Sequence, residues 1–285
     1  PQGAIPLANH HGSAPGIFLE SQGKQIFLLP GPPVELQPMW QNFALPLLRK
    51  GMPFNRKVFR IAMLPESEVD EMLRPVTGSL REVQYTILAS PSEIEVHLLA
   101  AETATDELIS SAAEVRAIMG KRIYAEDLET MEEVVGKLLR QQNRKIAVAE
   151  SCTGGLLAER ITNIAGSSSY FDYGLVTYSN EAKAKMLNVP ENLIAHHGAV
   201  SEPVAESMAE NIRKLAKADY GLSITGIAGP EGGTDEKPVG LVFIGLSEER
   251  GITVKEYRFI GSRARIRFSS THAALNMLRL KLLAL

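Results

Sequence analysis

The stretch at residues 145–157, KIAVAESCTGGLL, constrains the fold more than any other part of the chain. Its apolar residues 146–149 are bounded by a polar turn, and such a short run fits a buried strand rather than a helix. Gly154 and Gly155 follow, after which apolar residues recur at helical spacing. The sequence therefore predicts a strand, a tight turn and a helix whose first N–H groups can bind an anion. The same residues would serve as a cap and turn without any chemistry.

Composition indicates an ordinary globular protein. Hydrophobic residues make up 45% and charged residues 22% of 285 residues, a length that accommodates two or three domains. The net charge of -3 argues against nucleic-acid binding by bulk charge, although a basic patch lies near the end of the sequence. There is no signal peptide and no apolar run of about 18 residues, so we expect a cytoplasmic protein without a membrane segment.

The cysteine and histidine residues indicate neither a catalytic thiol nor a metal site. Cys152 is the single cysteine, which excludes an internal disulfide and fits a reducing cytoplasm. No base is identifiable for it, so we interpret it as a small buried packing residue. His97 belongs to the polar phase of a strand-like alternation, and the histidine pairs at 10–11 and 196–197 lack further ligands at metal-binding spacing. We expect no metal site.

Two smaller regions precede the last one. Residues 1–52 alternate Gly/Pro-rich turns with short apolar runs and end in a helix from Pro33, which Pro38 and Pro46 would kink. Because the chain opens on loop residues without a methionine, we interpret this region as the last third of a doubly wound α/β domain in a longer protein. Residues 54–124 predict a small α/β module with strands at 57–63, 85–88 and 94–99 and helices at 65–73 and 105–119. Residues 124–129 are expected to form a link.

Residues 126–285 form the third predicted domain. The expected order is helix, strand, helix, strand, helix, helix, strand, strand, strand, helix. This order predicts an α/β fold with a mostly parallel sheet. The expected strands lie at 146–149, 174–178, 220–224, 240–246 and 253–259, and the last helix starts at about residue 264.

Three of these strands end in a polar or glycine-rich corner, at residues 150–155, 177–180 and 225–230. In a parallel sheet the C-terminal ends of the strands lie along one edge, where α/β proteins bind ligands. We therefore expect Ser151 to lie near the amine of Lys183. The helix behind Ser151 would offer its N–H groups to a developing oxyanion.

Six ordered motifs in residues 126–285 resemble the C-terminal domain of the CinA family, which comprises competence/damage-inducible proteins and nicotinamide mononucleotide deamidases. They are AESCTGGLLAERIT, GSSSYF, VTYSNEAK, GAVSEPVA, ITGIAGPEGGTDEKPVG and GSR. Residues 1–52, with NHHGSAPG and LPGPPVE, resemble the end of the molybdopterin-binding-like domain of full-length members, and 54–124 resembles their KH-like linker module. By analogy, the module implies a homodimer.

The resemblance implies hydrolysis of nicotinamide mononucleotide to nicotinic acid mononucleotide and ammonia, a step of pyridine nucleotide salvage, without a cofactor. We assign Ser151 as nucleophile and Lys183 as base, which requires burial to lower the lysine pKa by several units from about 10.4. Tyr178 and Ser168 are expected to steer protons or orient Lys183. Spacing alone favours Lys183 as a solvated helix lysine, and only the resemblance favours the base.

The phosphate of such a substrate has two candidate sites. Arg263 precedes the last helix, and the backbone of residues 226–229 offers a nest of N–H groups. We favour Arg263. The other residues expected to contact the substrate are Thr225, Gly226, Thr153, Gly154 and Gly155.

Two alternatives concern the ends of the chain. Most of the basic residues at 258–281 are expected to form a solvated face, which would also suit a non-catalytic competence or recombination module that binds DNA by charge. A separate alternative is a catalytically idle adaptor that senses nucleotides. Few aromatic residues and no base-reading motif accompany this face, so we do not expect nucleic-acid binding. In full-length relatives the N-terminal domain is associated with ADP-ribose cleavage. This chain retains one acidic corner, at Glu35, so we expect it to lack that activity.

Overall fold

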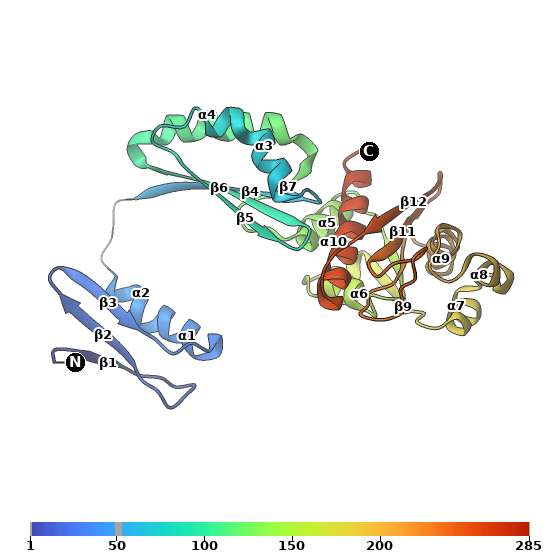
Figure 1. Ribbon diagram of the computed structural model, residues 1–285, viewed down its shortest axis with the longest axis horizontal. Helices are drawn as coiled ribbons and strands as arrows, with labels where there is room; N and C mark the ends of the chain where they lie inside the picture. Colours follow the sequence, from blue (N-terminus) through green and yellow to red (C-terminus); the bar gives the residue numbers. More distant parts are fainter. Residues whose placement is uncertain (1, 49–52, 285) are drawn as a thin grey trace. The chain divides into compact units, whose positions relative to one another are not determined.

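The computed structural model describes residues 2–48 and 53–284, and the chain divides into two units, Pro1–Pro53 and Phe54–Leu285 (Figure 1). The predicted boundary at residue 52 lies outside the described residues. The first unit is an antiparallel sheet in the order β1-β2-β3, followed by a helical segment. Its elements are β1 (Ile5–Leu7), β2 (Gly16–Ser21), β3 (Lys24–Leu28), α1 (Pro33–Met39), a π-helical turn (Trp40–Ala44) and α2 (Leu45–Leu47).

The prolines shape this helical segment as the sequence predicts. Pro33 opens α1, Pro38 lies inside it, and the α-helical pattern passes into a π-helical turn at Trp40. Glu35 lies in the first turn of α1 and accepts a hydrogen bond of 2.6 Å from the Asn9 amide. A carboxylate in a first turn stabilises the helix N-terminus, so Glu35 has a structural role in this unit.

The second unit begins with a four-stranded antiparallel sheet in the order β5-β6-β4-β7, covered by two helices that lie on the same side of it (Figure 1). Its elements are β4 (Phe54–Ala62), α3 (Glu66–Thr77), β5 (Gln84–Ser90), β6 (Glu93–Ala101), α4 (Thr105–Met119) and β7 (Ile123–Glu126). Burial alternates along β6, as its period-two pattern predicts. The link expected at 124–129 is wrong in its first residues, because β7 pairs with β4.

The remainder is a five-stranded mixed sheet in the order β12-β11-β10-β8-β9. β8 lies between β9 and β10 and is parallel to both, whereas the β11–β12 hairpin adds antiparallel strands beside β10. The predicted α/β class is therefore confirmed. The strands are β8 (Ile146–Glu150), β9 (Phe171–Val176), β10 (Tyr220–Gly226), β11 (Leu241–Glu248) and β12 (Gly251–Arg258).

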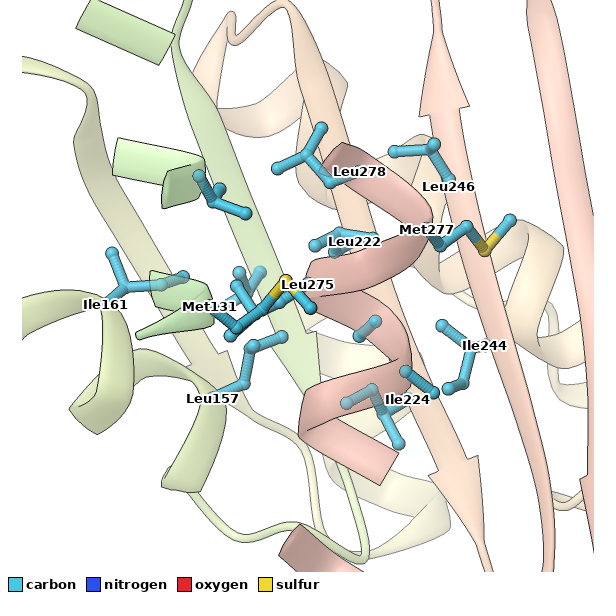
Figure 2. Packing of buried hydrophobic residues seen from close by; sticks show 14 of the residues in the cluster. Met131, Leu157, Ile161, Leu222, Ile224, Ile244, Leu246, Leu275, Met277 and Leu278 are labelled. Carbon is cyan, nitrogen blue, oxygen red and sulfur yellow. The ribbon is translucent and has the colours of Figure 1, made fainter. Parts of the chain in front are cut away.

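Helices cover both faces of this sheet, because successive residues of β8 point to opposite sides. Val148 joins one core, whereas Ala147 joins the other. Figure 2 shows Leu157, Leu222 and Leu275 of the first core. The first layer consists of α5 (Met131–Gln141), α6 (Leu156–Thr162) and α10 (Arg263–Leu282). The second consists of α7 (Asn180–Leu187), α8 (Glu191–His197) and α9 (Glu202–Ala216). The sequence predicted two helices in this second layer, so α8 is an addition.

Helix α10 is buried on most sides and also contacts the module at residues 54–126. Arg279 is 2% exposed, and its guanidinium donates to the carbonyls of Ile123 (3.2 Å) and Lys121 (2.7 Å). The expectation of a solvated basic face is wrong for this residue, because the helix that carries it forms part of the core. Within residues 2–48 and 53–284, no helix is long and apolar enough to cross a membrane.

Candidate active site

Ser151 lies at the C-terminal edge of the mixed sheet, directly after β8. Its amide donates to the carbonyl of Ile224 on β10 (3.0 Å), which extends the parallel ladder by one residue. Its carbonyl accepts from the amide of Gly154 (3.0 Å), so residues 151–154 close a tight turn. Gly154 and Gly155 both have positive φ (58° and 94°), the conformation that glycine adopts without strain. We call residues 151–155 the Ser151 turn.

Glu150 holds the Ser151 turn from the protein interior. Its carboxylate is fully buried and accepts hydrogen bonds from the amides of Gly155 (3.1 Å), Leu157 (3.0 Å) and Ala158 (2.8 Å). Gly155 is the N-cap residue of α6 and the other two amides belong to its first turn, where a carboxylate is well stabilised. The expectation that this helix N-terminus serves an oxyanion is therefore wrong for these three groups, because Glu150 already uses them.

Lys183 lies on α7 with its amine against the serine. The Nζ atom is 3.0 Å from Ser151 Oγ and donates to the Thr177 carbonyl at 2.9 Å. The side chain is 1% exposed, and burial lowers the pKa of the amine below its usual value. Ser179 caps α7 by accepting from the Ala182 amide, which fixes the helix that carries the lysine. The solvated helix lysine is thus ruled out by its burial.

Arg263 and Tyr178 form a pair at the rim of the site. The Arg263 guanidinium donates to the Gly229 carbonyl and to the Tyr178 hydroxyl, each at 2.9 Å. Tyr178 is 58% exposed. Within the part of the chain that the structure describes, the Tyr178 hydroxyl accepts from Arg263, and Lys183 bonds to Ser151 and Thr177. Tyr178 therefore forms no direct hydrogen bond to Lys183.

A cavity of about 270 Å³ opens at this edge of the sheet. Its walls come from the starts and ends of several elements, as expected for the C-terminal edge of an α/β sheet. Ser151 and Lys183 line it, together with residues of the loop at 225–232. Thr225 and Gly226 line the cavity as expected, together with Tyr178, Arg263, Ala199 and Val200.

Ser168 lies away from this cavity, contrary to our expectation. It belongs to the exposed 3-10 turn Ser167–Ser169, which precedes β9. Because β9 is parallel to β8, a residue before β9 lies at the opposite edge of the sheet from Ser151. The role assigned to Ser168 is therefore wrong.

Thr153, Gly154 and Gly155 also do not line the cavity. The Thr153 side chain is fully buried, and the Gly155 amide is bound by Glu150. The Ser151 turn folds back from the edge to start α6, so these residues lie behind the serine. They can shape the site but not form its wall.

Cys152 confirms the interpretation as a packing residue. It is 6% exposed and belongs to the apolar core, and burial raises the pKa of the thiol to about 12. A thiol with such a pKa is not ionised at neutral pH, so Cys152 cannot replace Ser151 as a nucleophile.

The sequence reasoning gave no role at the site to two basic side chains near the cavity: it did not consider Lys237, and it placed Arg267 on the solvated basic face. Lys237 donates to the carbonyls of His197 (2.6 Å) and Val200 (2.8 Å), which fastens the loop after β10 to the turn before α9. Arg267 donates to the Thr153 carbonyl through Nε (3.2 Å) and Nη2 (2.6 Å). Its position four residues after Arg263 on a helix places both arginines on one face, a signal that the sequence does contain.

Comparisons with known proteins agree with these regions. The family model of the CinA C-terminal domain matches residues 128–282, and that of the damage-inducible protein CinA KH domain matches residues 56–125. The chain is 45% identical over 295 residues to a CinA-like protein of Koribacter versatilis, covering 99% of this chain and 70% of the relative. It is 42% identical over 285 residues to a putative competence-damage inducible protein of Caldicellulosiruptor saccharolyticus, covering 98% and 69%.

Solved structures give the same result for the last domain. A CinA superfamily protein of Klebsiella pneumoniae shares 34% identity with a TM-score of 0.53, covering 55% of this chain and 100% of that chain. The competence/damage inducible protein CihA of Agrobacterium tumefaciens shares 38% identity with a TM-score of 0.51, covering 54% and 96%.

Proposed function

The chain belongs to the CinA family, and on that premise we propose that it hydrolyses the carboxamide of nicotinamide mononucleotide to nicotinic acid mononucleotide and ammonia. One observation carries the proposal: a serine hydroxyl lies 3.0 Å from a buried lysine amine whose pKa is lowered. A nucleophile within hydrogen-bond distance of a base is the arrangement that amide hydrolysis requires.

Lys183 would act as the base in its neutral form. Donation to the Thr177 carbonyl holds the amine in place, so that its lone pair can face Ser151 Oγ. As Oγ bonds to the carboxamide carbon, the hydroxyl proton passes to Nζ and the carbonyl oxygen gains the negative charge. The resulting ammonium then donates its proton to the amide nitrogen, and ammonia leaves as the C–N bond breaks. Water, deprotonated by the same amine, would release the product from Ser151.

The charge on the carbonyl oxygen needs N–H donors close to Ser151. The amides of Cys152 and Thr153 donate to no oxygen of another residue within the part of the chain that the structure describes. The residue after the nucleophile commonly supplies such a donor in serine hydrolases. We assign the Cys152 amide, whose residue lines the cavity, as the oxyanion donor, in place of the α6 N–H groups that bind Glu150.

Arg263 remains our candidate for the phosphate. It lines the same cavity as Ser151, and its contacts with Gly229 and Tyr178 use two of the five N–H groups that an arginine has. The other N–H groups can form charge-assisted hydrogen bonds to a phosphate, with the loop at 226–229 supporting them. Tyr178 would then orient Arg263 and close the rim.

DNA binding by the C-terminal basic residues is not favoured. Arg267 donates to the Thr153 carbonyl, and Arg279 is buried against Lys121 and Ile123. Side chains that are used in this way are not available as a charged surface for a phosphate backbone.

The test is to identify the product. The purified chain is incubated with nicotinamide mononucleotide, and the mixture is separated by anion-exchange chromatography. We expect nicotinic acid mononucleotide and an equal amount of ammonia. Release of free nicotinamide instead would show cleavage of the glycosidic bond and would overturn the proposal.

A further inference from the structure

Helix α10 carries two arginines, one helical turn apart, that contact two different parts of the site. Arg263 contacts the rim at Gly229 and Tyr178, whereas Arg267 contacts the Ser151 turn at the Thr153 carbonyl. Residues four apart on a helix share one face, so a single helix can contact both the rim and the Ser151 turn. Arg267 does not line the cavity itself.

The contact of Arg267 with Thr153 has the geometry of a strong anchor. Nε and Nη2 both donate to one carbonyl oxygen, at 3.2 and 2.6 Å, and a charged donor makes such bonds stronger than neutral ones. The same oxygen also accepts from the Leu156 amide at 3.2 Å. The Thr153 hydroxyl is buried and has no partner within residues 2–48 and 53–284, so hydrogen bonds to the backbone hold this residue.

The Ser151 turn is thereby held from two sides. Glu150 binds its C-terminal end at Gly155 from the interior, and Arg267 binds Thr153 from α10. The Cys152 amide lies between these anchors, next to the serine. Its direction depends on the orientation of the peptide planes in this turn, which the hydrogen bonds of Arg267 to the Thr153 carbonyl help to fix.

We propose that Arg267 is a positioning residue for the nucleophile: it fixes the Ser151 turn so that Ser151 Oγ and the Cys152 amide converge on the reacting carbonyl. This inference rests on the proposed function. It assigns to Arg267 an effect on the chemical step rather than on substrate binding, which distinguishes it from Arg263.

The chain offers a matched control on the same helix. Arg265 is exposed, and its side chain contributes to a different cavity, which Met63, Pro65 and Ile260 also line. Replacing either arginine with glutamine removes one positive charge from the same turn of α10. A difference between the two variants therefore reports the hydrogen bonds to Thr153 rather than the loss of charge.

The experiment compares Arg267→Gln, Arg267→Lys and Arg265→Gln with the wild type. For Arg267→Gln we expect kcat for nicotinamide mononucleotide to fall about 10- to 100-fold, because small displacements of a nucleophile cost that much. We expect KM to change less than about twofold and the midpoint of the pH–rate profile to stay constant, since Lys183 is untouched. Arg267→Lys should retain part of the activity, and Arg265→Gln should match the wild type.

A second readout does not depend on the substrate. Phenylmethanesulfonyl fluoride forms an S–O bond with a reactive serine as the S–F bond breaks, and intact-mass spectrometry follows the reaction at Ser151. We expect slower labelling of Arg267→Gln than of Arg265→Gln. If the wild type is labelled but releases no ammonia, the proposed function fails, and the labelling rates still decide the role of Arg267.

With a wild type that is active or labelled, three results would overturn the role of Arg267. They are an unchanged kcat and labelling rate in Arg267→Gln, an equal loss in Arg265→Gln, or a rise in KM alone. A wild type that is neither active nor labelled would also overturn it, because there would be no nucleophile to position. If Arg267→Gln does not fold, as judged by circular dichroism, Arg267→Lys and Arg265→Lys make the same comparison.

Discussion

His272 allows a prediction whose magnitude follows from the structure. It lies in the middle of α10 and is fully buried, with Nδ1 3.5 Å from the Arg160 guanidinium. Burial, followed by the positive charges of Arg160, Arg279 and Arg60, lowers the pKa of its imidazole to about 3. Three cations around one ring strongly oppose a fourth charge, so the folded protein holds this histidine neutral.

The consequence is a loss of stability in acid. An unfolded histidine has a pKa of about 6.5, so between pH 6.5 and 3 the unfolded chain binds a proton that the folded chain does not bind. The free energy of unfolding therefore falls as the pH falls through this window, by at most about 1.4 kcal/mol per pH unit. From pH 7 to pH 4.5 this single residue should cost about 2–3 kcal/mol.

The perturbation is His272→Gln, because glutamine has similar size, can still accept a hydrogen bond from Arg160 and does not titrate. Urea unfolding of both proteins is followed by far-ultraviolet circular dichroism at pH 7 and pH 4.5. The one tryptophan, Trp40, lies in the other unit and would not report on this one. The variant should lose about 2–3 kcal/mol less than the wild type over this pH range. Equal losses would show that His272 does not contribute and would refute the reasoning.

Three further predictions concern the site. Lys183→Arg should lose nearly all deamidation in an ammonia assay, because an arginine stays protonated and cannot act as base, and retained activity would place the base elsewhere. In the wild type, kcat/KM should rise with pH and level off below pH 10.5, the usual lysine pKa, because burial lowers the pKa of Lys183. Arg263→Ala should weaken binding of nicotinamide mononucleotide by about 1.5–3 kcal/mol and barely affect the dephosphorylated nucleoside, and an equal effect on both would mean that Arg263 does not hold phosphate. Cys152→Ala should keep kcat within a few-fold of the wild-type value. A loss of kcat as large as that expected for removal of the nucleophile would indicate that the Cys152 thiol is the nucleophile.

The sequence predicts the elements that have a clear period. Helix α4 matches its expected bounds, and β8 and β10 are found where apolar runs end in polar corners. The sequence does not reveal β7, because a strand of four residues forms only through its pairing with β4. Nor does it reveal α8, whose seven residues are too few to show a helical period.

The sequence likewise predicts one part of the candidate site and not the rest. The proximity of Ser151 and Lys183 follows from a general rule, that parallel strands end at one edge, and it can be predicted without coordinates. Ser168 was misplaced because its motif gives an order along the chain and not a position at one end of the sheet. The contact of Arg267 with Thr153 joins residues 114 positions apart, and only the packing of α10 on the sheet brings them together.

The central claim is that Ser151 attacks a carboxamide with the help of Lys183. The most direct test measures ammonia release from nicotinamide mononucleotide by the wild type and by Ser151→Ala, with circular dichroism to confirm that both are folded. We expect the wild type to release ammonia and the variant to be slower by several orders of magnitude, since only binding and the oxyanion donors would remain. Equal rates in the two proteins would contradict the account.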